Sequence, residues 1–213
     1  MSYYSHIIWD FNGTLLDDVS AGIRSINTLL NRRGMRPIAS AEEYRELFRF
    51  PIIDYYRSLG FDFDKEPYER LAVEWVAEYR READRAALQP GAAELLIYIK
   101  ERKYRQILLS ATELHMLRRQ TDALGITDAF HEILGLDNIH AASKIELALT
   151  WKEREQPRRM LLVGDTDHDA ETARALGADC ILIAIGHQSE KRLQSCGALA
   201  VVPSVKALYP YIR

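Results

Sequence analysis

The segment that decides the fold reads Ile7-Ile8-Trp9-Asp10-Phe11-Asn12-Gly13-Thr14, a short apolar run that stops at an aspartate and a glycine turn. Similar apolar runs occupy residues 107–109, 160–163 and 181–185. None of them alternates between apolar and polar residues, which is typical of strands buried on both faces of a parallel sheet. Segments with helical periodicity lie between the runs. We therefore expect an α/β protein with a doubly wound, Rossmann-like parallel sheet.

Residues 17–88 show a different pattern. Ile23, Ile26 and Leu29 follow helical spacing, and so do residues further along this region, whereas no convincing strand run interrupts it. The turn residues Gln89-Pro90-Gly91 then mark the return to the strand-and-helix pattern. The sequence predicts a small helical domain at 17–88, inserted into a core domain made of 1–16 and 89–213.

The composition excludes several classes of protein. The chain has 213 residues, of which 47% are hydrophobic, and a net charge of -3, which argues against a general nucleic-acid binder. No stretch approaches the roughly 18 consecutive apolar residues that a membrane span requires, and the N-terminus does not resemble a secretory signal. We expect a cytoplasmic protein with no nucleic-acid or membrane partner, either a monomer or a homodimer.

Polar residues stand where the predicted strands end. Asp10 follows the first apolar run, Ser110 follows the second, and Asp165 follows the third, while Lys144 precedes a helical segment. In an open parallel sheet, ligands bind in the crevice outside the carboxyl ends of the strands. Each of these residues alone is most often a turn former, a helix cap or a solvated side chain. Their joint order indicates a site with two carboxylates, a hydroxyl and an amine.

The same residues carry a resemblance to the haloacid dehalogenase (HAD) phosphatases, which extends over essentially the whole chain. Residues 10–15 are similar to the first motif of that family, 108–112 to the second, Lys144 to the third and 164–169 to the fourth. The first and fourth motifs are specific when they occur together. The helical insertion resembles the C1-type cap of phosphoglycolate phosphatase relatives.

The resemblance implies a phosphohydrolase that acts on a small phosphorylated metabolite. Asp10 would be the nucleophile and form an aspartyl-phosphate that water then hydrolyses. Ser110, the backbone at Ala111 and the hydroxyl or backbone N–H of Thr14 would hold phosphate oxygens. Lys144 would contact both Asp10 and the phosphate and keep the carboxylate ionised.

The resemblance also implies a magnesium cofactor. The carboxylates of Asp10 and Asp165 and the backbone carbonyl of Asn12 would be the protein ligands, with Asp169 bound directly or through a water. Asp165, Asp167 and Asp169 form a run of three carboxylates, which repel one another unless a cation or a helix N-terminus is near.

Asn12 departs from the family pattern, because most of these phosphatases have a second aspartate there that acts as general acid and base. An amide has the same shape but cannot exchange protons usefully near neutral pH. Four interpretations follow. The substrate has a good leaving group, as in acyl or aryl phosphates, or another group, such as Asp17, Asp18 or a cap residue, supplies the proton. Alternatively, the chain mainly binds a phosphorylated ligand, with weak or vestigial catalysis, or Asn12 is an engineered substitution. The sequence favours an active but atypical phosphatase.

Cap residues usually select the substrate in this family. Arg45 and Arg49, one helical turn apart, are candidates to contact an anionic substrate tail, and Tyr55 and Tyr56 to line the same pocket. His187 is expected at the edge of the site, with a structural role.

Overall fold

The core of the molecule is a six-stranded parallel sheet with strand order β5-β4-β1-β6-β7-β8. The computed structural model describes residues 4–83, 85–137 and 143–212. Strand β1 lies at the centre, and the chain builds outward first through β4 and β5 and then, on the other side, through β6, β7 and β8. The strands are β1 (His6–Trp9), β4 (Arg105–Glu113), β5 (Glu132–Leu136), β6 (Met160–Gly164), β7 (Asp179–Ile183) and β8 (Ala200–Val202).

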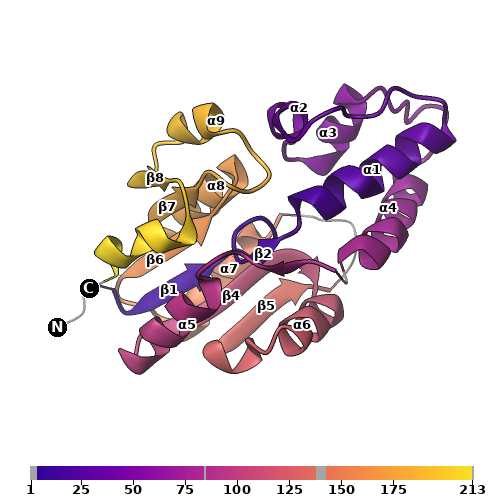
Figure 1. Ribbon diagram of the computed structural model, residues 1–213. Coiled ribbons are helices and arrows are strands. Elements are labelled where there is room, and N and C mark those ends of the chain that lie inside the picture. The colour runs from indigo at the N-terminus through magenta and orange to yellow at the C-terminus, as the bar shows by residue number, and fades with distance from the viewer. Residues whose placement is uncertain (1–3, 84, 138–142, 213) are drawn as a thin grey trace.

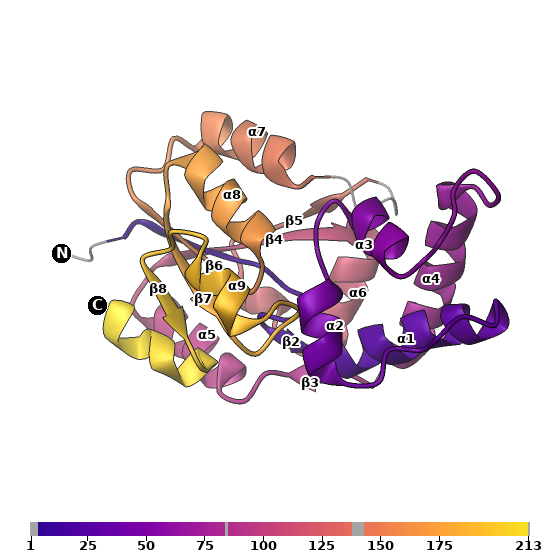
Figure 2. The same ribbon diagram turned by 90° about the horizontal axis from the view of Figure 1, so that it is seen from above.

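Helices cover both faces of this sheet (Figure 2). One face carries α5 (Ala92–Glu101), α6 (Leu114–Ala123) and two 3-10 segments, η1 (Thr127–Ala129) and η2 (Val205–Tyr211). The other carries α7 (Ile145–Glu155), α8 (Asp167–Leu176) and α9 (Glu190–Gln194). The expected α/β doubly wound core is thereby confirmed.

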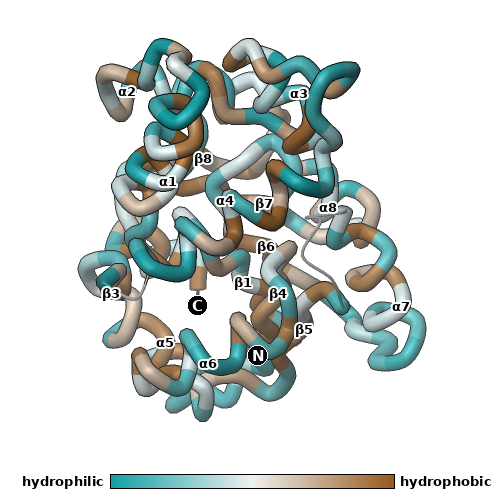
Figure 3. The backbone as a smooth tube through the Cα atoms, turned by 90° about the vertical axis from the view of Figure 1, so that its right-hand side faces the viewer, coloured by the Kyte–Doolittle hydropathy of each residue, from teal (hydrophilic) through white to brown (hydrophobic). Residues whose placement is uncertain are grey.

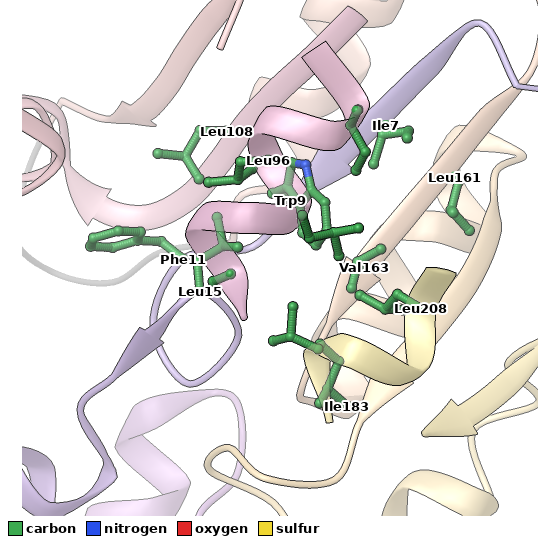
Figure 4. Packing of buried hydrophobic residues seen from close by; sticks show 14 of the residues in the cluster. Ile7, Trp9, Phe11, Leu15, Leu96, Leu108, Leu161, Val163, Ile183 and Leu208 are labelled. Atoms are coloured by element: carbon green, nitrogen blue, oxygen red, sulfur yellow. The ribbon is translucent and has the colours of Figure 1, made fainter. Parts of the chain in front are cut away.

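Alternation along β1 explains why both faces must be covered. Ile7 and Trp9 point into the layer beneath α5 and η2, as Figure 4 shows, whereas Ile8 belongs to the cluster on the opposite face. All three side chains are almost completely buried. The indole N–H of Trp9 donates to Gln106 Oε1 at 3.0 Å, which satisfies the one polar atom that this ring brings into the core.

The inserted region forms a separate helical layer beyond one end of the sheet (Figure 1). The chain leaves the core through β2 (Leu16–Asp17) and returns through β3 (Ala87–Leu88), and these two strands pair antiparallel. This pairing differs from the sequence expectation of no strand within 17–88, because two-residue strands are too short to show a pattern. Between them lie α1 (Val19–Arg32), α2 (Ala41–Leu47), α3 (Ile52–Ser58) and α4 (Tyr68–Ala83). We propose to treat 17–88 as the cap and the remainder as the core.

The cap has an apolar cluster of its own. Ile26, Leu29 and Leu30 of α1 pack against Leu71 of α4 and against the aromatic side chains of α3. Helix α2 is short, and its N-cap is Ser40, whose hydroxyl accepts from the backbone N–H of Glu43 at 3.1 Å. The cap is therefore a packed unit that lies beyond the end of the sheet, not a set of loose surface helices.

Hydrophobic residues concentrate along the strands. In Figure 3 brown segments lie along the central strands, and teal segments mark outer helices such as α7. In the described parts of the chain no helix combines the length and the apolar character that a membrane crossing needs.

Candidate active site

Three buried carboxylates meet where the strand order reverses. Asp10 directly follows β1, Asp165 directly follows the neighbouring strand β6, and Asp169 lies in the first turn of α8. One oxygen of each lies within 4.8 Å of the others. The three side chains are buried, so water screens the repulsion between their charges only weakly. This is the switch-point crevice at which open α/β sheets bind ligands.

Lys144 is the cation of this cluster. It lies just before α7 and is only 3% exposed. Its Nζ forms an ion pair with Asp10 Oδ1, lies 2.7 Å from Asp169 Oδ1 and donates to the carbonyl of Leu109 at 3.3 Å. Lys144 thus links the end of β1 to the start of α8.

The hydrogen bonds of Asp169 fix its orientation. Its Oδ2 accepts from the backbone N–H groups of Asp165 at 3.1 Å and Thr166 at 3.0 Å, and from the Thr166 hydroxyl at 2.6 Å. This is a capping-box arrangement at the N-terminus of α8. With Oδ2 occupied in this way, Oδ1 is directed at Lys144.

One lysine does not balance three carboxylates. Burial raises the pKa of Asp10 well above its usual value, and the carboxylates of Asp169 and Asp165 raise it further against the opposing effect of Lys144. Burial also raises the pKa of Asp165 to about 6. Burial would raise the pKa of Asp169 too, but Lys144 outweighs it and leaves that pKa lowered. Burial and mutual repulsion therefore disfavour full ionisation of the cluster, and a divalent cation would favour it.

The protein packs closely around Asp165. Its Oδ1 accepts from the Thr14 hydroxyl at 3.0 Å, and its Oδ2 accepts from the backbone N–H of His187 at 2.6 Å. Gly13, at φ 74°, and Gly186 both approach this carboxylate so closely that a Cβ at either position would collide with it. The Thr14 hydroxyl is therefore engaged by Asp165, and Thr14 is not among the residues that line the cavity. The expected contact of Thr14 with phosphate stays a prediction.

An irregularity in β4 shapes the other side of the site. Leu109 pairs with Leu134 and Glu113 pairs with Leu136, so β4 uses four residues where β5 uses two. Such bulges redirect side chains at the edges of functional sites. Here Ser110 and Ala111 line the cavity beside Asp10, and the Ser110 hydroxyl accepts from the backbone N–H of Thr112 at 3.1 Å.

Asn12 is fully engaged with the protein. Its amide group donates to Asp18 Oδ2 at 2.9 Å and to the Tyr79 hydroxyl at 2.7 Å, while its carbonyl accepts from the Thr112 hydroxyl at 2.8 Å. The Tyr79 hydroxyl also donates to Asp18 Oδ2 at 2.6 Å. The amide at position 12 therefore supplies a donor that the buried Asp18 carboxylate needs.

Asp18 and His187 form a second charged pair next to this network. His187 Nε2 lies 3.2 Å from Asp18 Oδ1, and its Nδ1 lies 2.8 Å from the Tyr44 hydroxyl. Burial alone would lower the pKa of His187, but Asp18 outweighs it and raises that pKa to about 9. Burial would raise the pKa of Asp18, and His187, followed by Tyr79 and Asn12, keeps it lowered.

A cavity of about 160 Å³ lies between the core residues and the cap. Asp10, Asn12, Ser110, Ala111, Lys144 and Asp165 line it from the core. From the cap, Tyr55 and Tyr56 line it as expected, together with other aromatic residues. His168, at the start of α8, is 6% exposed and packs against Phe50 with ring centroids 4.8 Å apart.

Arg45 and Arg49 are not among the residues that line this cavity. Arg45 donates from Nε to the carbonyl of Gly186 at 2.9 Å and from its terminal nitrogen to the carbonyl of Ile185 at 3.1 Å, so it fastens the cap to the core. Arg49 donates to the carbonyl of Leu47 at 3.1 Å. The expected contact of either arginine with a substrate tail has no support in this structure.

Sequence reasoning missed most of the network around Asn12. Asp18 had a signal, since it is one of two aspartates that follow the first motif. Tyr79 and Thr112 had none, because they lie 67 and 100 residues from Asn12 in the chain and meet it only in the fold.

A parallel sheet with a carboxylate cluster at its switch point, a buried lysine and a helical cover is the arrangement of a capped hydrolase with a Rossmann-like core. The chain belongs to the haloacid dehalogenase-like hydrolase family, whose sequence profile matches residues 7–183. This match confirms the expected family and enzyme class. Among curated relatives, a protein named phosphoglycolate phosphatase from Pseudomonas fluorescens is 23% identical, over 96% of this chain and 78% of the relative.

Solved structures share the fold across nearly the whole chain. A haloacid dehalogenase-like hydrolase from Streptococcus pneumoniae superposes with a TM-score of 0.83 at 19% identity, covering 98% of each chain. Protein tyrosine kinase A from Mycobacterium tuberculosis superposes with a TM-score of 0.81 at 22% identity, covering 98% of this chain and 97% of that one. At such identities the likeness concerns the fold, which hosts more than one named activity.

Proposed function

We propose that the protein is a magnesium-dependent phosphatase that hydrolyses a small phosphate monoester through an aspartyl-phosphate on Asp10. The proposal rests on the buried cluster of Asp10, Asp165 and Asp169, whose oxygens lie within 4.8 Å of one another. Among the described residues that line the cavity, Lys144 is the only lysine, and it forms ion pairs with Asp10 and Asp169. Curated relatives with the name phosphoglycolate phosphatase support the reaction class.

The residues present fit a magnesium ion. Mg²⁺ prefers oxygen ligands, and the site offers three carboxylates. Burial and mutual repulsion raise the pKa values of Asp10 and Asp165, so a nearby positive charge would stabilise their ionised forms. Asp10, Asp165 and Asp169, with the backbone carbonyl of Asn12, would hold it. When bound, the ion neutralises charge on the phosphate oxygens and permits an anionic nucleophile to approach.

The chain's own residues would carry the two chemical steps. In the first, a carboxylate oxygen of Asp10 forms a bond to phosphorus, and the bond from phosphorus to the ester oxygen breaks, with its electron pair leaving on that oxygen. Ser110, the backbone at Ala111 and Lys144 hold the phosphate oxygens. In the second, water attacks the phosphorus and gives up a proton to the solvent, the bond from phosphorus to the Asp10 oxygen breaks, and phosphate leaves the restored Asp10 carboxylate.

Asn12 makes the second step slow, because its amide cannot accept the proton of the attacking water. The aspartyl-phosphate should therefore accumulate during turnover. Asn12 equally cannot protonate the leaving group in the first step, so substrates whose leaving oxygen is stable as an anion should react fastest.

Removing Mg²⁺ should abolish turnover and lower the melting temperature, and the second effect should depend on pH. With Asp165 at a pKa of about 6, against 3.8 as its ordinary value, the folded metal-free protein binds more protons than the unfolded chain in that window. Its stability therefore falls as pH rises from about 4 to about 6. Mg²⁺ competes with those protons, so its stabilising effect should be small at pH 5 and full at pH 7.5.

The measurement is thermal unfolding with Mg²⁺ or with EDTA. At roughly 100 times its dissociation constant, a ligand adds about 2.7 kcal/mol, which corresponds to a rise in Tm of roughly 5–10 °C for a chain of this size. The Asp165→Asn variant should lose the Mg²⁺ effect, and sodium chloride at equal ionic strength should not reproduce it. Equal Tm values in Mg²⁺ and EDTA at pH 7.5 would contradict the proposal that the folded protein binds Mg²⁺.

Replacing Asn12 by aspartate should raise the turnover of alkyl phosphates by roughly 10- to 100-fold, within the usual range for general acid–base catalysis. The new carboxyl group would lie beside Asp18, whose Oδ2 is 2.9 Å from Asn12 Nδ2. A carboxylate neighbour raises the pKa of the new group, which favours the protonated form that an acid requires. Initial rates on an alkyl phosphate, against those on an aryl phosphate, measure the gain.

The double variant Asn12→Asp/Asp18→Asn is the matched control. It exchanges the carboxylate and the amide, so the new acid has no like-charged neighbour and its pKa is lower than in the single variant. The activity on alkyl phosphates should therefore decline at a lower pH than in the single variant. If Asn12→Asp gives no gain on alkyl phosphates, another group already supplies the proton.

A phosphorylated-ligand binding protein with vestigial catalysis is the alternative function. Its specific support is Asn12, which occupies the usual acid/base position and is held there by three hydrogen bonds. A screen of phosphate esters with and without Mg²⁺ separates the two functions. The alternative gains if no ester shows metal-dependent turnover above that of Asp10→Asn while phosphorylated compounds still bind.

A further inference from the structure

The two halves of the cavity differ in chemistry. The core half presents Asp10, Ser110 and Lys144, which suit a phosphate group. The cap half is built largely from aromatic side chains contributed by α3, α4 and the segment between α2 and α3. Its aromatic members include Phe48, Phe50, Tyr55, Tyr56, Tyr68 and Trp75.

These rings already pack against one another. Phe48 and Phe50 have ring centroids 5.7 Å apart in an edge arrangement, and Phe48 and Tyr55 lie at 5.2 Å. Aromatic rings prefer such edge-to-face and offset contacts, and a further ring placed in the cavity would gain the same kind of contact. The organic part of the substrate therefore meets a surface that favours an aromatic group.

A second negative charge on the substrate has no lysine or arginine partner among the described residues of the cap half. Of the described residues that line the cavity, Lys144 is the sole lysine or arginine, and it is engaged by Asp10 and Asp169. Arg45 and Arg49 donate to backbone carbonyls instead. A buried carboxylate without a cationic partner is strongly disfavoured. The cavity therefore disfavours phosphoglycolate and other substrates that carry a second anionic group besides the phosphate.

The Asn12 network points to the same class of substrate for an independent reason. All three hydrogen bonds of its side chain go to Asp18, Tyr79 and Thr112, so it brings no exchangeable acid proton to the ester oxygen. The leaving group must then depart as an anion. A phenol ionises near pKa 10, whereas an aliphatic alcohol resembles water, whose pKa is about 15.7. An aryl ester loses its leaving group without the missing acid.

The cavity is small. It holds about 160 Å³, which is close to an engineered apolar cavity of about 150 Å³ that accepts benzene. A substrate with a single ring suits this size better than one with several rings.

We propose that the substrate is a phosphate monoester of a phenol with one uncharged ring, seated against the aromatic wall of the cap. This inference rests on the proposed phosphatase function and adds the substrate class to it. Asp10 bonds to phosphorus, the bond from phosphorus to the aryl oxygen breaks, and the oxygen leaves as phenolate, which takes a proton from water.

The first part of the test compares substrates with Mg²⁺ present. Phenyl phosphate should show a kcat/KM at least about 100-fold above that of benzyl phosphate, which keeps the ring but leaves as an alkoxide, a gap within the range of a missing general acid. Phosphoglycolate should be the poorest of the three. If phosphoglycolate or benzyl phosphate matches phenyl phosphate, the inference on substrate class is overturned while the phosphatase function stands.

The second part isolates binding from leaving-group chemistry. Phenylphosphonate and phosphonoacetate cannot be hydrolysed at a P–O ester bond, and they differ in carrying a ring or a carboxylate. Phenylphosphonate should inhibit at least about tenfold more tightly, because the aromatic wall recognises the ring. Equal or reversed inhibition would overturn the role of the wall.

Variants of the wall complete the test. Phe50→Leu and Trp75→Leu keep an apolar side chain but remove a ring, and each should raise the KM for phenyl phosphate several-fold with a smaller change in kcat. Val73→Ala, on the outer face of α4 and 54% exposed, is the control that should leave both unchanged. Unchanged KM values in both folded ring variants would contradict the inference. Failure of every ester, with or without Mg²⁺, would instead contradict the phosphatase function.

Discussion

Replacing Asp10 by asparagine should reduce the hydrolysis of every phosphate ester by about 10³-fold or more, since the loss of a covalent nucleophile is among the largest single effects in enzymes. The amide keeps the shape of the side chain, which is only 8% exposed, but offers no anionic oxygen to phosphorus. The measurement is kcat on phenyl phosphate with saturating Mg²⁺.

The same substitution should not destabilise the metal-free protein. Burial and the nearby carboxylates of Asp169 and Asp165 raise the pKa of Asp10, so the ionised form opposes folding when no metal is bound. We expect an unchanged or higher Tm in EDTA together with the loss of activity, which is the usual conflict between function and stability at an active site.

Asp17→Asn is the matched control, because Asp17 follows the same motif but its side chain is exposed in β2. It should retain wild-type kcat. If Asp10→Asn keeps more than a few per cent of the wild-type rate, another residue is the nucleophile and the assignment of Asp10 is wrong.

Replacing Lys144 by methionine should lower both activity and stability. Methionine fills a similar volume but leaves Asp10 and Asp169 buried without their cation. Removing one partner of a buried ion pair typically costs about 3–5 kcal/mol, which predicts a fall in Tm of roughly 10 °C for a chain of this length. Losing a cation that faces the phosphate should lower kcat by about 10²- to 10³-fold.

Thermal unfolding and initial rates measure these two effects. Mg²⁺ should restore part of the lost Tm, because it supplies positive charge to the same carboxylates. Lys65→Met is the contrasting control, since Lys65 pairs with Asp62 at 2.8 Å on the surface with its own side chain 84% exposed, and such pairs contribute about 0–1 kcal/mol. Wild-type Tm and kcat in Lys144→Met would show that the buried pair has no role.

The fold was predictable where a strand is buried on both faces. Uninterrupted apolar residues mark β1, β6 and β7, and the break at Asp10 marks the end of β1. Strands β5 and β8 escaped prediction because they lie at the edges of the sheet. Glu132 and Gly135 interrupt the apolar run of β5, and β8 has only three residues, too few to show a strand pattern.

The candidate site was predictable only as far as local motifs reach. The expected meeting of Asp10 and Asp165 follows from the topology of a parallel sheet, because residues at the carboxyl ends of neighbouring strands lie at the same end of the sheet. The partners of Asn12 come from the cap and from the β4 bulge, and no local pattern encodes those contacts. The same limit applies to Arg45, whose guanidinium reaches the backbone of the core at Gly186 and not the cavity.

The central claim is that Asp10 becomes phosphorylated during turnover, and that Asn12 makes the phosphorylated form accumulate. Its most direct test is to quench the enzyme with acid during turnover of phenyl phosphate in Mg²⁺ and to analyse its peptides by mass spectrometry. We predict one phosphoryl group on the peptide that contains Asp10, absent without Mg²⁺ and diminished in Asn12→Asp, in which water attack is faster. Metal-dependent turnover with no phosphoryl group on that peptide would contradict the account.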